Sequence, residues 1–121
     1  MTFLTERFAA AVRRLVGDGP IKQRLGQAYA QYLDDLRESD FPGALQRQFA
    51  DLAAAMHRSP ALGKEGAVKM TVQKMSFAEA TTHAETIVKL YAEVVRSAER
   101  SEPLKVVHTE EKLQRLIAGA Q

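Results

Sequence analysis

The most constraining feature of the sequence is a run of apolar residues spaced alternately three and four positions apart. The run consists of Phe77, Ala80, Ala84, Ile87, Tyr91, Val94 and Ala98. Because an α-helix completes one turn in about 3.6 residues, this spacing puts the whole run on one face of a helix. Ser76 and Glu79 stand at its start in the order of a capping box, in which each side chain accepts a hydrogen bond from the backbone N–H of the other residue. A helix over residues 76–100 is therefore predicted.

The same spacing recurs in earlier parts of the chain, between clusters of glycine and proline. One cluster, Gly-Asp-Gly-Pro at residues 17–20, separates the first two apolar runs, because glycine and proline both end helices. We predict helices over residues 2–16, 20–38, 42–58 and 76–100, with a short C-terminal helix over residues 110–118. A length of 121 residues fits one folded unit. The expected fold is an all-α, four-helix bundle-like domain that spans residues 1–121.

Residues 67–75 do not distinguish between helix and strand. Val68, Met70 and Val72 alternate as in a strand, whereas Val68, Val72 and Met75 share a helix face. Residues 104–107 follow a proline and also fit an extended segment. The alternative fold is therefore α+β, with short strands near residues 68–72 and 104–107 on either side of the long helix.

Composition and charge exclude several classes of protein. There is no cysteine, which excludes disulfides, thiolate nucleophiles and sulfur ligands for metals. The 17 basic and 15 acidic residues give a net charge of +2 and form no basic tail. No apolar run approaches the roughly 20 residues of a membrane span, and the N-terminus lacks the pattern of a secretory signal. We expect a cytoplasmic protein that does not associate with membranes.

Few residues suggest chemistry. Glu79 and His83 share a helix face and offer two metal ligands, but no zinc-protease or di-iron spacing accompanies them. His57 fits a cation at the C-terminus of a helix. The loop at residues 63–66 has one lysine between two glycines, which is too short for a phosphate-binding loop. No catalytic residue, cofactor site or metal site is predicted, so we expect a protein that is not an enzyme.

The wide apolar stripe of the longest helix suggests contact with another protein. A central helix in a bundle would use this stripe within its own chain, whereas a dimer would share part of it with a second copy. The residues proposed for such a partner or self-association surface are Phe77, Ile87, Val88, Tyr91, Val94 and Val95. The leading hypothesis is a non-enzymatic helical protein-interaction or regulatory module that self-associates, most simply as a homodimer.

Two other functions remain open. An accessory nucleic-acid-binding protein would use basic side chains to contact phosphates, and the candidates are Arg13, Arg14, Lys64, Lys69 and Lys74. An enzyme would need a pocket assembled from residues far apart in the sequence. The first alternative predicts binding that weakens steeply with salt, and the second predicts a concave pocket with several titratable groups.

Overall fold

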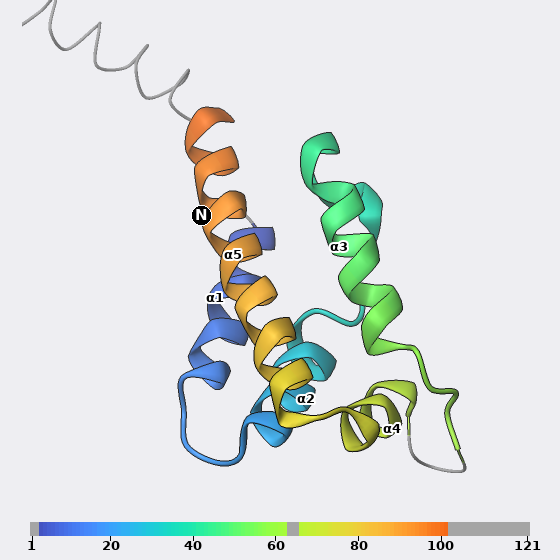
Figure 1. Cartoon of the computed structure of the whole chain (residues 1–121). Coiled ribbons are helices and arrows are strands. Elements are labelled where there is room, and N and C mark those ends of the chain that lie inside the picture. Colours follow the sequence, from blue (N-terminus) through green and yellow to red (C-terminus); the bar gives the residue numbers. More distant parts are fainter. Residues whose placement is uncertain (1–2, 63–65, 102–121) are drawn as a thin grey trace, which may run out of the picture.

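The structure is a computed structural model that describes residues 3–62 and 66–101. Its elements are α1 (Phe3–Leu15), α2 (Ile21–Tyr32), the short 3-10 helix η1 (Glu38–Asp40), α3 (Gly43–Met56), α4 (Ala67–Lys74) and α5 (Phe77–Ser101) (Figure 1). Every element in this part of the chain is helical, so the all-α prediction is confirmed. The alternative strand at residues 68–72 is wrong, because these residues lie within α4. The helix expected at 110–118 and the strand considered at 104–107 lie outside the described residues.

Helix α5 is the central element of the fold. It packs against α1, α2 and α3, while α4 closes one end of the molecule by packing against α2 and α3 (Figure 1). The inner face of α5 consists of Ala80, Ala84, Ile87, Leu90 and Val94, all of which are buried. These residues follow the three-and-four spacing of the sequence, so burial of this stripe explains why the segment is a single long helix.

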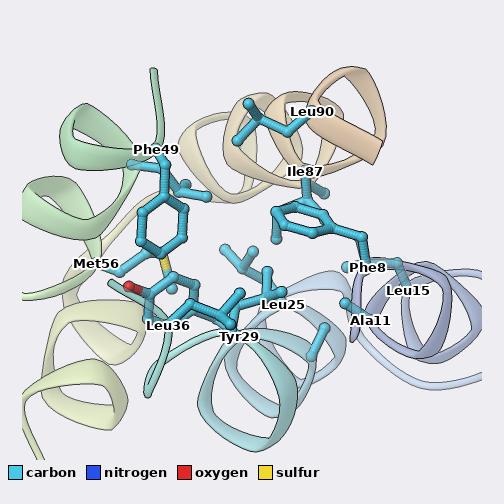
Figure 2. Close-up of a cluster of buried hydrophobic side chains, with 14 of the residues drawn as sticks. Phe8, Ala11, Leu15, Leu25, Tyr29, Leu36, Phe49, Met56, Ile87 and Leu90 are labelled. Atoms are coloured by element: carbon cyan, nitrogen blue, oxygen red, sulfur yellow. The ribbon is translucent and has the colours of Figure 1, made fainter. Parts of the chain in front are cut away.

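Side chains from all five α-helices meet in one hydrophobic core. Figure 2 shows Phe8 of α1 beneath Ile87 of α5, with Tyr29 of α2 facing Phe49 and Met56 of α3. The figure also labels five other residues of this core, namely Ala11, Leu15, Leu25, Leu36 and Leu90. Burial of these apolar surfaces is the main force that holds the helices together.

Phe41, which lies between η1 and α3, joins two parts of this core. Its ring stacks on Phe49 with centroids 4.4 Å apart, and it meets Phe8 edge-on at 5.9 Å. Offset stacked and edge-to-face arrangements are the favourable geometries for aromatic pairs. The irregular segment after α2 is therefore anchored through this buried ring.

The second helix is shorter than predicted, and a side chain from α1 binds its C-terminal end. We predicted that it extends to residue 38, but α2 ends at Tyr32. The guanidinium of Arg7 donates to the Tyr32 carbonyl at 2.9 Å and to both carboxylate oxygens of Asp35 at 2.6 and 2.8 Å. The same contact lowers the pKa of the Asp35 carboxyl. Arg7 thus binds the carbonyl of the last residue of α2, one of the acceptors that the end of a helix leaves without an intrahelical partner.

The start of α5 agrees with the predicted capping box. The Ser76 backbone N–H donates to Glu79 Oε1 at 2.9 Å, and the Glu79 N–H donates to Ser76 Oγ at 3.0 Å. These bonds satisfy two donors that a helix start leaves without partners. The hydrogen bond from Ser76 also lowers the pKa of the Glu79 carboxyl.

Candidate functional site

A groove of about 570 Å³ lies between α2 and α4 and is the best candidate for a binding site. Two helices that are far apart in the sequence form its walls. Helix α2 contributes Lys22, Gln23, Gly26, Gln27, Ala30 and Gln31, and α4 contributes Val68, Lys69, Val72 and Gln73. Ligand sites in proteins commonly occupy roughly 300–1,000 Å³, so the groove is large enough to hold a ligand or several side chains of another protein.

The floor of the groove is apolar. Val68 and Val72 of α4 are buried and Gly26 of α2 is half-buried, and the exposed Ala30 extends this apolar lining along α2. A Cβ atom on Gly26 would lie 3.6 Å from Cγ2 of Val72, which is an ordinary van der Waals distance. Gly26 thus lies against Val72 where α2 and α4 pack on each other, with room for a methyl group between them.

The rim of the groove is rich in amides. Gln23, Gln27 and Gln31 lie on successive turns of α2, and Gln73 lies on α4. Each side-chain amide can donate and accept hydrogen bonds. Gln27 Oε1 accepts a hydrogen bond from Arg14 Nε at 2.6 Å, so this amide is held in place by α1.

The two walls carry positive charge only. Helix α2 contains Lys22 and Arg24, α4 contains Lys69 and Lys74, and neither helix contains an acidic residue. Four basic residues and no acidic residue thus lie on these two helices of a chain whose net charge is only +2. The basic residues are therefore not matched by acidic residues within α2 and α4 themselves.

Lys22 crosses one end of the groove. Its Nζ donates to the carbonyl oxygen of Gln73 at 3.0 Å, and it lies 5.5 Å from the centroid of the Phe77 ring. Arg24, in contrast, is directed towards α1, because its guanidinium donates to the carbonyls of Gly19 and Leu15. Lys22 and Lys69 are thus the cations that line the groove.

A second, smaller pocket of about 350 Å³ lies between α3 and α5. It contains His83, whose pKa is lowered by burial and by the nearby positive charge of Arg58. Two hydroxyls share the pocket, but Thr82 donates to the carbonyl of Ala78 and Thr86 to that of Thr82, each at 3.1 Å. Because these protons are directed into the helix backbone, the threonines are not paired with His83 as nucleophiles.

The residues proposed from the sequence for self-association occupy different environments. Ile87 and Val94 belong to the core, with exposed fractions of 0% and 2%. Phe77 and Val88 are 68% and 45% exposed. The other two proposed residues, Tyr91 and Val95, are partly buried. The apolar stripe therefore serves mainly to pack α5 within its own chain, and only its edge faces solvent.

The basic residues proposed for phosphate contacts are also dispersed. Lys69 lines the groove, and Arg14 reaches its edge through Gln27. Arg13 and Lys74 are exposed but do not line it. Lys64 lies outside the described residues. Our sequence interpretation missed the groove itself; the available signals were the four-residue spacing of glutamines in α2 and the lack of acids in both walls.

Comparisons with known protein families, curated proteins and solved structures found no match to this chain. The structure itself defines the class of the protein, which is all-α in its described part. In residues 3–62 and 66–101, no helix combines the length and apolar character needed to cross a membrane. The same residues contain no group of three or more His, Asp or Glu side chains that could hold a metal ion.

Proposed function

We propose that this protein is a non-enzymatic helical interaction module that holds a segment of a partner protein in the α2–α4 groove. The observation that supports this most directly is an open groove with an apolar floor and a polar rim. Apolar side chains of a partner gain free energy by leaving water at the floor. Rim amides and lysines then select the orientation of the bound segment, as a few polar groups do in most binding sites. The lack of cysteine suits a protein of the cytoplasm.

A homodimer through α5 has less support. Such a dimer would depend on Phe77 and Val88, with smaller contributions from Tyr91 and Val95, because Ile87 and Val94 are already buried. Stable dimers generally bury about 800 Å² on each partner. We therefore propose the groove, and not the edge of α5, as the main contact surface.

Nucleic-acid binding is also supported less well. Single-stranded nucleic acids bind to grooves that combine cations with aromatic side chains for base stacking. Among the described residues that line the groove, none is aromatic. Arg14 is already bonded to Gln27 and to the Asp18 carbonyl. The apolar lining of Gly26, Ala30, Val68 and Val72 suits apolar side chains better than phosphates.

Selection from a displayed peptide library tests the proposal. Ala30→Trp fills the groove from an exposed position, and Ala92→Trp makes the same change on the exposed side of α5, away from both pockets. We expect selected peptides to bind the wild type and Ala92→Trp equally, and to lose at least about tenfold in affinity on Ala30→Trp, equivalent to about 1.4 kcal/mol. Backbone amide shifts should change mainly in α2 and α4.

The proposal is wrong if the library yields no binder, or if the binders tolerate Ala30→Trp. Circular dichroism and thermal unfolding of both tryptophan variants establish that each retains the fold. Because the exchange of alanine for tryptophan is identical at the two positions, any difference in peptide binding reports the location of the site.

A further inference from the structure

We infer that the C-terminal segment of this chain, residues 104–118, folds back and occupies the pocket between α3 and α5. This inference does not rest on the proposed function, because it concerns a different surface. It starts from the large apolar residues that follow Ser101 in the sequence, namely Leu104, Val106, Val107, Leu113, Leu116 and Ile117. Such side chains gain free energy when another surface removes them from water.

The end of α5 places this segment next to the pocket. Helix α5 ends on the side of the molecule where α3 begins, and these two helices form the walls of the pocket (Figure 1). Along α5, Ser101 lies about 18 Å from Lys89 and about 28 Å from Thr82, at roughly 1.5 Å per residue. Residues 102–110 can span up to about 30 Å when extended. Residues 110–118 can therefore reach the whole pocket.

The α2–α4 groove is farther from the end of α5. Lys22, which lines that groove, lies 5.5 Å from the ring centroid of Phe77, the first residue of α5. Ser101 is about 36 Å from this end of the helix, at roughly 1.5 Å per residue. Residues 102–110 do not span that distance, so the reach of the chain favours the α3–α5 pocket over the α2–α4 groove.

The lining of the pocket suits apolar side chains. Leu52 of α3 is buried at its base, and Ala55 beside it is half-buried. The opposite wall contains Thr82 and Thr86, whose hydroxyls donate to helix carbonyls. These threonines therefore add methyl groups to the lining and no hydroxyl proton that a ligand could use. An occupant gains free energy here chiefly by bringing apolar surface against this lining.

The apolar residues of the segment have the spacing that such a pocket accepts. Leu113, Leu116 and Ile117 fall at positions i, i+3 and i+4, which share one face of a helix. A groove between two helices binds a third helix through residues at this spacing. At roughly 1.5 Å per residue, a helix over residues 110–118 would extend about 12 Å, and the pocket from Thr82 to Lys89 extends about 11 Å. The segment therefore matches the pocket in length.

Charge indicates the direction in which the segment lies. Lys89 is exposed at the end of the pocket nearer to Ser101. Within residues 3–62 and 66–101, no carboxylate lies at ion-pair distance from Lys89. Glu110 and Glu111 precede the three apolar residues in the sequence, so a segment that returns from the end of α5 brings them to Lys89 first. Opposite charges then face each other, as they do in specific interfaces.

The covalent link to α5 favours the chain's own segment over a second copy. A binding segment joined by a short linker has an effective concentration of the order of millimolar. A weak contact with the pocket is therefore sufficient for occupancy, whereas a second copy would need a much stronger one at ordinary protein concentrations.

Disulfide trapping in the full chain tests the inference, because the sequence contains no cysteine. One variant combines Thr86→Cys in the pocket with Ala118→Cys in the segment. The matched control combines Ala118→Cys with Ala92→Cys, on the exposed side of α5 away from both pockets. A disulfide needs its two Cα atoms within about 7 Å, so we expect the intrachain bond to form at least about tenfold faster in the Thr86 variant. Random encounters favour the control, because Ala92 is closer to Ala118 in the sequence.

Further substitutions in the Thr86 variant identify the contacts. Leu116→Glu puts a charge on the apolar face and should slow the bond at least about tenfold. Gln114→Glu adds the same charge outside that face and should change the rate by less than about twofold. Lys89→Glu should slow the bond by about 1.4- to 5-fold, and the added exchange of Glu110 and Glu111 for lysine should restore it.

Three results would overturn the inference. Equal rates in the Thr86 and Ala92 variants would show that the segment does not occupy the pocket, and a rate unchanged by Leu116→Glu would show that its apolar face is not the contact. Disulfide-linked dimers in place of the intrachain bond would assign the pocket to a second copy. Circular dichroism of the reduced variants establishes that each retains the fold. Peptide selection on the α2–α4 groove is a separate measurement, so either proposal can fail while the other holds.

Discussion

The Nε2 atom of His57 lies 2.6 Å from Oδ1 of Asp34, so the C-terminal cap of α3 is bonded to the turn that follows α2. The imidazole also meets the ring of Tyr29 edge-on, with centroids 6.2 Å apart. His57 thus has two contacts with one neighbouring segment, one polar and one aromatic. Its role in the fold is to connect the end of α3 to the end of α2.

These two contacts predict different effects for their removal. Asp34→Asn removes only the charge of a half-exposed pair, so we expect the free energy of unfolding to fall by less than about 1 kcal/mol. His57→Ala also removes the contact with Tyr29, which adds about 0.5–1.5 kcal/mol. Urea unfolding of both variants measures the difference. Equal losses in the two variants would show that the ring contact contributes nothing.

Neighbouring residues of α5 should respond very differently to truncation. Ile87 is fully buried, and Ile87→Ala should lower the free energy of unfolding by about 2–5 kcal/mol. Val88 is 45% exposed, and Val88→Ala should change it by less than about 0.5 kcal/mol. Thermal or urea unfolding at several protein concentrations tests this. A large, concentration-dependent loss for Val88→Ala would instead indicate that the exposed edge of α5 binds a second copy.

Two glycines should respond to alanine with opposite signs. Gly19 has a φ of +107°, a conformation that alanine adopts only with strain, so Gly19→Ala should destabilise the protein by at least about 1 kcal/mol. Gly43 begins α3, and a Cβ there meets no atom within 4 Å. Gly43→Ala should therefore stabilise the protein by about 0.4–1 kcal/mol, because it restricts the unfolded chain. Paired unfolding curves give both signs directly.

His83 should make stability depend on pH near neutrality. Burial and Arg58 hold its pKa below the ordinary value of 6.5, although Glu79 opposes them. The unfolded state therefore binds a proton more readily, and stability should fall as the pH drops through 6.5 and below. His83→Gln should show a smaller fall between about pH 8 and pH 5.5. The pKa values of the Asp35 and Glu79 carboxyls are lowered from 3.8 and 4.5, so their contributions to stability are lost only in a more acidic range, as the pH falls through those values and below. An identical pH profile for the variant would contradict this account.

Features that depend on adjacent residues could be predicted from the sequence. The capping box of Ser76 and Glu79 and the turn at residues 17–20 were both correct, because neighbouring residues determine them. The end of α2 was not, because Arg7 reaches Tyr32 from 25 residues away. A pattern read along the chain contains no information about such a contact.

The candidate site was harder to predict for the same reason. Lys22 and the Gln73 carbonyl are 51 residues apart, so only the packing of α2 on α4 brings the groove together. The apolar stripe of α5 shows a different limit of prediction from sequence. Packing within one chain and packing between two chains require the same spacing of residues such as Ile87 and Val94. Burial in the structure, and not periodicity, distinguishes the two.

The position of Lys22 couples the groove to the first turn of α5. Its ammonium contacts both the last turn of α4 and the Phe77 ring, so any group in the groove that attracted the ammonium would compete with both contacts. Because linkage between binding events is reciprocal, a stronger contact between Phe77 and Lys22 would weaken the binding of such a group, and the group would weaken that contact in return. Phe77 would thereby influence affinity at the groove without being one of the residues that line it.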